Sequence, residues 1–80
     1  MDAKWTGPSD KIWKDSQCKH LKNLKGQLPY CRQVCEDMQG CNAINVKLGE
    51  GCALRNCPYP TPIPEWDFPG HVGYAKEGKK

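Results

Sequence analysis

No stretch of this 80-residue sequence is long and apolar enough to cross a membrane. A signal peptide is also lacking, because Met1 is followed by Asp2, Ala3 and Lys4 instead of an apolar run. There is no N-x-[ST] acceptor and no redox C-x-x-C motif. These absences exclude membrane insertion and thioredoxin-like redox chemistry from the functions that we expect.

The sequence also lacks a recognisable catalytic constellation. His20 and His71 have no nucleophile partner at a meaningful spacing, and neither Ser9 nor Ser16 lies in a G-x-S-x-G context. We therefore expect a non-enzymatic protein without a cofactor.

Apolar residues are scarce, at 38% of the chain with a mean hydropathy of -0.80, so the core of so short a chain is marginal. Six cysteines can supply the missing stability, since each disulfide contributes roughly 2–4 kcal/mol. Zinc sites favour C-x2-C knuckles with matching histidines, and neither is present, so we expect no metal. The even cysteine count predicts a disulfide framework in an oxidising compartment.

Secretion follows from that framework. We expect the protein to be extracellular or the ectodomain of a cell-surface protein, and the chain to be an excised mature domain with an added start methionine. The net charge of +3 is mild, although lysines crowd the first third of the chain. Such a weak charge predicts no nucleic-acid partner.

The beginning of the chain shows little regular pattern. Gly7-Pro8 interrupts residues 1–9, which we interpret as a loose entry, whereas Ile12 and Trp13 suit a short strand. Residues 19–27 favour a loop or at most one turn of helix. The expected organisation is a flexible segment 1–11, in part added to the natural chain, then a domain over 12–76 and a flexible tail 77–80.

A helix of about three turns is the clearest predicted element. Pro29 suits its first turn, and Gly40 is the expected left-handed stop. Four residues follow the spacing of one buried helix face: Cys31, Val34, Cys35 and Met38.

Strands are predicted after this helix. Residues 42–48 alternate, with Ile44, Val46 and Leu48 on one side, and residues 49–51 form a turn before the returning arm at 52–55. Alternating prolines from Pro58 to Pro64 predict an extended surface loop of polyproline character. Residues 72–76 can form a closing strand.

The cysteines are distributed over these elements. Cys31 and Cys35 share a helix face, and Cys41 and Cys52 each head a strand of the hairpin, so two bridges between helix and strands are natural. Which partners join stays open on this ground. The two remaining cysteines, Cys18 and Cys57, would tie the amino-terminal segment to the end of the hairpin.

Three sequence features together, CRQVCEDMQGCNAINV, GCALRNC and the late Gly73-Tyr74, resemble the PAN/apple domains. The resemblance spans residues 18–74. It implies a small disulfide-rich α+β fold, with an antiparallel sheet of about five strands crossed by one helix. It also implies the pairs Cys31–Cys52 and Cys35–Cys41, which leaves Cys18–Cys57. The sequence departs from apple repeats because Cys57 closely follows Cys52, and the family pattern does not explain the loop 58–68 that comes next.

What the resemblance implies about function is binding without catalysis. We expect an extracellular recognition or adhesion module for a protein or carbohydrate ligand, such as a glycosaminoglycan, within a larger secreted or cell-surface protein. One alternative is a stand-alone secreted inhibitor of the anticoagulant type, which blocks a protein partner. The other is a structural spacer without a ligand.

Two groups of side chains are candidate ligand contacts. The first is basic and suits a sulfated glycan, or else it is a solvated lysine-rich loop: Lys19, His20, Lys22 and Lys25, with Lys14 nearby. The second is aromatic and suits a sugar ring or a protein hot spot: Tyr59, Trp66 and Phe68. Alternatively, Trp66 folds inward as a lid over a small sheet. We assign Trp13 and Tyr74 to the core and leave Trp5 unassigned.

Overall fold

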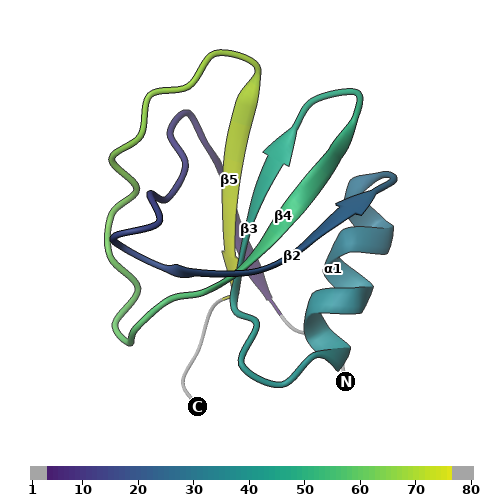
Figure 1. The fold of residues 1–80 in the computed structure, drawn as a ribbon, viewed down its shortest axis with the longest axis horizontal. Coiled ribbons are helices and arrows are strands. Elements are labelled where there is room, and N and C mark those ends of the chain that lie inside the picture. Colours follow the sequence, from purple (N-terminus) through teal and green to yellow (C-terminus); the bar gives the residue numbers. More distant parts are fainter. Residues whose placement is uncertain (1–3, 77–80) are drawn as a thin grey trace.

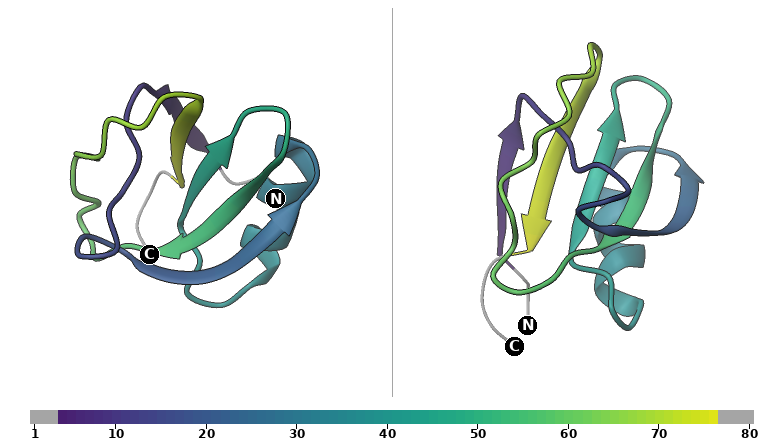
Figure 2. Two further views of the ribbon diagram at one scale, coloured as in Figure 1. Left: turned by 45° about the horizontal axis from the view of Figure 1, so that its top comes forward. Right: turned by 60° about the vertical axis from the view of Figure 1, so that its left-hand side comes forward.

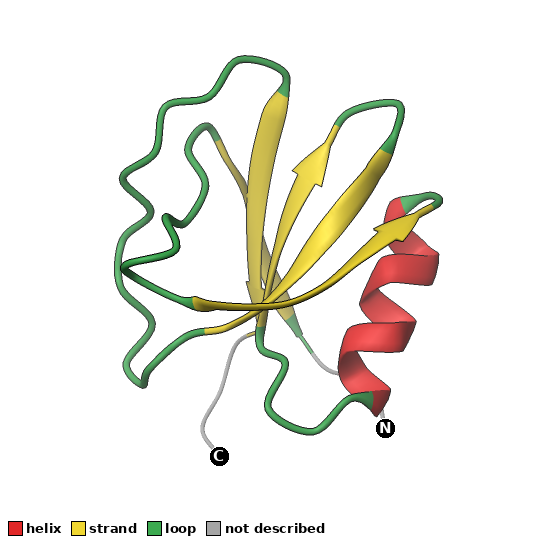
Figure 3. Cartoon of the chain, viewed as in Figure 1, coloured by secondary structure: helices red, strands yellow, loops and turns green. Residues whose placement is uncertain are grey.

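The computed structural model describes residues 4–76. It contains one helix and five strands, in the order β1 (Trp5–Ser9), β2 (Lys19–Lys25), α1 (Leu28–Asp37), β3 (Ala43–Lys47), β4 (Gly51–Asn56) and β5 (His71–Lys76). Figure 1 shows the path of the chain, and Figure 3 separates helix, strands and loops. The fold is therefore a small disulfide-rich α+β domain.

All five strands form one antiparallel sheet with the order β1-β5-β3-β4-β2. β3 is central, and it pairs with β4 in a hairpin and with β5 on its other side. The turn of this hairpin contains Gly49 at a φ of 81°, a conformation that glycine adopts without steric cost. The predicted hairpin and closing strand are confirmed, except that Leu48 lies exposed in the turn and not on the strand.

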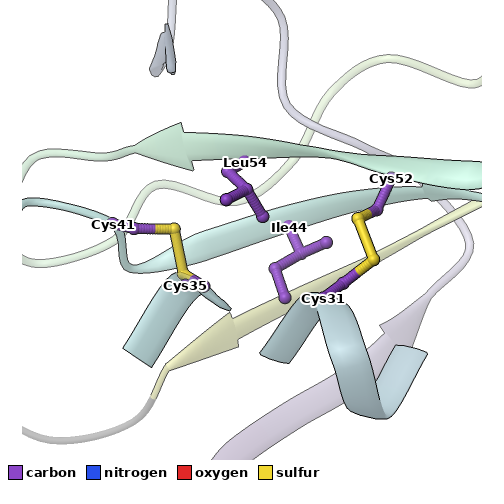
Figure 4. Close-up of a cluster of buried hydrophobic side chains, with 6 residues drawn as sticks. All are labelled: Cys31, Cys35, Cys41, Ile44, Cys52 and Leu54. Atoms are coloured by element: carbon purple, nitrogen blue, oxygen red, sulfur yellow. A yellow bond between two sulfur atoms is a disulfide. The ribbon is translucent and has the colours of Figure 1, made fainter. Parts of the chain in front are cut away.

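The helix α1 forms as the sequence predicts. Pro29 lies in its first turn. The helix ends earlier than predicted, at Asp37 with Met38 as an extended C-cap, so Gly40 adopts its φ of 89° two residues after the cap and does not itself end the helix. α1 packs against β3 and β4, where Ile44 and Leu54 are fully buried between helix and sheet. Figure 4 shows these two side chains between two disulfides, so that sulfur and aliphatic groups together form the main core.

Three disulfides close the fold: Cys18–Cys57, Cys31–Cys52 and Cys35–Cys41. The last two join α1 to the strand β4 and to the segment before β3. They are the pairs that the resemblance implies, and the first is the remaining pair. Three bridges in a domain of this size indicate an oxidising environment.

Two predictions for the first part of the chain are wrong. The residues from Trp5 to Ser9, expected to be a loose entry, form the edge strand β1 against β5, and Pro8 is tolerated because an edge strand needs fewer backbone donors. The segment expected to be a loop forms the other edge strand, β2. Ile12 and Trp13, expected to be a strand, contribute only a single bridge between Ile12 and Trp66.

The connections β1–β2 and β4–β5 lie side by side, away from α1 (Figures 1 and 2). Backbone hydrogen bonds join Ile12 to Trp66 in both directions, and Trp13 Nε1 donates to the carbonyl of Pro62 at 2.7 Å. Trp13 is buried, as predicted. It forms a second core cluster with the first disulfide and two alanines of the sheet: Trp13, Cys18, Ala43, Cys57 and Ala75. The two connections thus cover part of the sheet face that is turned away from the helix.

Within the described part of the chain, no helix is long and apolar enough to cross a membrane.

Candidate ligand-binding groove

The uncovered part of the sheet face opposite α1 forms a groove of about 610 Å³. This volume falls in the range of small-ligand sites, which is roughly 300–1,000 Å³. The floor of the groove consists of side chains from the two central strands, and its walls come from the β4–β5 connection and from β2. Its main lining residues are Asn23, Lys25, Asn45, Lys47, Glu50, Ala53, Arg55, Trp66, Phe68 and His71.

Asn45 fixes the floor to the covering connection. Its Oδ1 accepts a hydrogen bond from the backbone N–H of Trp13 at 3.2 Å, and its Nδ2 donates to the carbonyl of Trp13 at 3.0 Å. Because Asn45 is buried, both ends of its amide require such partners. The bonds hold the β1–β2 connection beside the groove.

One wall of the groove is a stack of three rings from the β4–β5 connection and the start of β5. The centroids of Trp66 and Phe68 are 4.9 Å apart, and those of Phe68 and His71 are 4.3 Å apart, with the planes nearly parallel in both pairs. The ring of His71 is also fixed by a contact of 3.1 Å between its Nδ1 and the carbonyl oxygen of Pro69. This wall is therefore preorganised.

Arg55 is the only buried cationic side chain within residues 4–76, with 5% of its surface exposed. Its Nη1 donates to Asp15 and, at 3.0 Å, to the carbonyl of Cys18. Its Nε is buried and has no hydrogen-bond partner among the described residues. The guanidinium hydrogen bond, and then its charge, hold the pKa of the Asp15 carboxyl below its ordinary value.

The rim of the groove carries further charge. Lys47 forms an ion pair with Glu50 at 3.0 Å across the hairpin turn. Lys25, at the end of β2, forms no ion pair within the described residues. Asp15 does not line the groove, so the positive charges of the groove lining outnumber the negative ones.

The basic residues predicted as one cluster do not share one surface. In an antiparallel sheet, directly opposed residues lie on the same face. Lys22 opposes the core residue Leu54, which places it on the helix side of β2, whereas Lys25 lines the groove. His20 opposes Arg55 on the groove side, where its Nε2 is 2.9 Å from the Oδ1 of Asn23. Lys19 lies on the helix side as Lys22 does, because it opposes Asn56, which is two residues beyond Leu54 along β4 and so faces the same side.

The aromatic candidates are also divided. Trp66 and Phe68 stack on each other in the aromatic wall of the groove. Trp66 is not a buried lid over the sheet, because 39% of its surface is exposed. Tyr59 is 73% exposed and does not line the groove. Tyr74 is half-buried, and the guanidinium of Arg32 lies over its ring at 5.2 Å and over that of Trp5 at 5.9 Å.

Sequence reasoning missed Arg55 and Asn45 as site residues. The available signal was the alternation of side chains along a strand. Arg55 follows Leu54 and Asn45 follows Ile44. Because Leu54 and Ile44 face the helix, Arg55 and Asn45 must face the opposite side of the sheet. Which part of that face stays open depends on the two long connections, and their packing has no signal in the sequence.

No group of three or more metal-ligating side chains could hold a metal ion within residues 4–76. Comparison of the chain with models of known protein families, with curated proteins and with solved structures finds no match.

Proposed function

We propose that this domain is a non-enzymatic recognition module of the PAN/apple type, from a secreted or cell-surface protein, that binds a protein or carbohydrate ligand in the groove. The family assignment is supported by the cysteine spacing, the three bridges and the five-stranded antiparallel sheet. In this assignment α1 crosses the sheet.

The observation that carries the proposed function is the preformed groove itself. It combines an aromatic wall with a few convergent polar groups, the usual composition of a binding site. Its walls are held in place by covalent and hydrogen-bonded connections, so a ligand orders few side chains on binding.

The test begins with a glycan array and a heparin column, beside a screen of secreted protein partners. Any ligand found is then measured against Trp66→Ala, which removes the end of the ring stack but keeps the backbone bridge to Ile12. Tyr59→Ala is the matched control, since it removes an exposed aromatic from the same connection outside the groove. We expect Trp66→Ala to abolish binding with only a small decrease in Tm, and Tyr59→Ala to change neither.

The proposal fails if Trp66→Ala lowers Tm by several degrees while each folded molecule still binds. Trp66 would then be a structural cap, and the ligand would bind elsewhere.

A further inference from the structure

We infer that the groove selects a sugar ring that bears a carboxylate, with the carboxylate directed at Arg55. The inference rests on the proposed function and specifies the class of ligand for the same site. Three features carry it: the charge of the groove, the unused hydrogen-bond donors of Arg55 and the geometry of the ring stack.

The lining of the groove carries three cations and one carboxylate: Lys25, Lys47, Arg55 and Glu50. Lys47 is neutralised by Glu50, and both lie at the rim. Lys25 and Arg55 remain, and the acidic partner of Arg55 is Asp15, whose side chain is 84% exposed outside the groove. Lys25 is therefore the lining cation that forms no ion pair within residues 4–76, and it opposes Gly51, four residues along β4 from Arg55. An anionic group placed at Arg55 meets no unpaired carboxylate from residues 4–76 in the lining.

Arg55 has donors to spare. A guanidinium carries five N–H groups, and both of the side-chain hydrogen bonds of Arg55 are made by Nη1. The buried Nε has no partner among the described residues. The buried Nε is closed to a ligand, but the two N–H groups of Nη2 form no hydrogen bond among the described residues and are not fully buried. They can donate a charge-assisted hydrogen bond to a carboxylate, which is stronger than a hydrogen bond to a neutral hydroxyl group.

The ring stack also favours a ligand rich in acceptor oxygens. Phe68 is engaged on both faces, by Trp66 and by His71, so it meets the groove chiefly with its edge. Aromatic edges carry the positive part of the ring quadrupole and attract oxygen atoms, while only the end rings offer a face.

A sugar ring fits this arrangement better than an acidic peptide does. The polar groups of Asn23, Lys47 and Glu50 are spread along the lining and can pair with several hydroxyl groups at once. An aspartate or glutamate side chain supplies only its carboxylate and offers these groups no further hydrogen bond.

The test uses two methyl glycosides that differ in one group. Methyl β-glucuronide carries a carboxylate where methyl β-glucoside carries a hydroxymethyl group. Both are titrated into the native, ¹⁵N-labelled protein, and the amide resonances of Lys25 and Ala53 and the Nε–H resonance of Arg55 are followed. We expect these three to shift with the glucuronide, with an affinity about tenfold or more above that of the glucoside, as a charge-assisted pair provides.

Variants then locate the charge effect. Lys25→Gln should lower the preference for the glucuronide only in part, because it deletes the exposed cation of the groove but leaves Arg55 in place, four residues along β4 from the Gly51 that Lys25 opposes. Lys19→Gln is the matched control on the helix side of the same strand and should preserve the preference. Arg55→Lys keeps the charge but loses the Nη2 donors, and its folding is checked by the same spectra.

Each remaining outcome counts against the inference. Equal affinity for the two glycosides would overturn the acidic selectivity and leave the proposed function standing. Absence of shifts with both glycosides would overturn the inference as well. If a glutamate-rich peptide moved the same resonances at lower concentration than the glucuronide, the occupant would be a protein partner. A ligand from the array screen that mapped to another face would overturn the proposed function itself.

Discussion

The three disulfides should contribute unequally to stability, in the order of the loops that they close. The bridges Cys18–Cys57, Cys31–Cys52 and Cys35–Cys41 span sequence separations of 39, 21 and 6 residues. If restriction of the unfolded chain dominates, removing them costs about 3.9, 3.3 and 2.2 kcal/mol at 25 °C, respectively.

The comparison is clean because all six cysteines are buried to a similar degree. Replacing each pair by alanine therefore removes similar packing, and the differences between variants report on the loops. The Cys18/Cys57 variant should be about 1.7 kcal/mol less stable than the Cys35/Cys41 variant. In a domain of this size that difference lowers Tm by roughly 7–14 °C.

The assay is urea unfolding followed by circular dichroism, with m-values compared to check that the extent of unfolding is constant. Mass spectrometry confirms that the two remaining bridges are intact in each variant. If the Cys35/Cys41 variant proved as unstable as the Cys18/Cys57 variant, the loop argument would be refuted. The contacts at the end of α1 would then be the main contribution of the short bridge.

Three further predictions concern the core and its polar links. Reduction of all bridges should unfold the domain at physiological temperature, and a cooperative thermal transition close to that of the oxidised protein would contradict this. Asp15→Asn should lower Tm above the ordinary pKa of aspartate, near 3.9, where the wild-type carboxylate is charged and paired with Arg55. Because Arg55 lowers that pKa, the advantage of the wild type should vanish as the pH falls through the lowered value, and a difference that persists in acid would argue against the ion pair. Asn45→Ala should cost on the order of 2–4 kcal/mol in urea unfolding, since it leaves two backbone groups of Trp13 without partners, whereas exposed Asn23→Ala should cost almost nothing.

The sequence predicts those parts of the fold in which the spacing of apolar residues repeats without interruption. α1 keeps the 3.6-residue spacing through Cys31 and Cys35, and the β3–β4 hairpin keeps the two-residue alternation on both sides of a glycine turn. Local pattern and final structure agree there, because nothing else in the fold disturbs the pattern.

The two edge strands were missed because each is irregular. The pairing of β2 shifts register between His20 and Lys22, so its inward residues Leu21 and Leu24 are three positions apart, a helical spacing and not that of a strand. β1 also shifts register, between Thr6 and Ser9 around Gly7-Pro8. A β-bulge interrupts the two-residue periodicity of a strand, so the periodicity of the sequence does not reveal such a strand.

Some residues of the candidate site were predicted from the sequence and others were missed. Trp66 and Phe68 were found because large aromatics in a Pro-rich segment are conspicuous. Arg55 was missed because its role depends on tertiary structure: it pairs with Asp15 of the β1–β2 connection, which is distant in the sequence, and it borders the groove that the two connections leave open.

The pairing of the first strand with the last has a consequence for how the domain can be connected. Trp5 and Lys76 oppose each other across β1 and β5, and opposed Cα atoms in such a pair lie about 4.5–5.5 Å apart. A short linker can therefore join these positions, while new ends are opened at Gly49 in the exposed hairpin turn. Such a circular permutant keeps every strand pair and all three bridges. For the same reason, residues 5–76 can be inserted into a surface loop of another protein with little separation between the points of entry and exit.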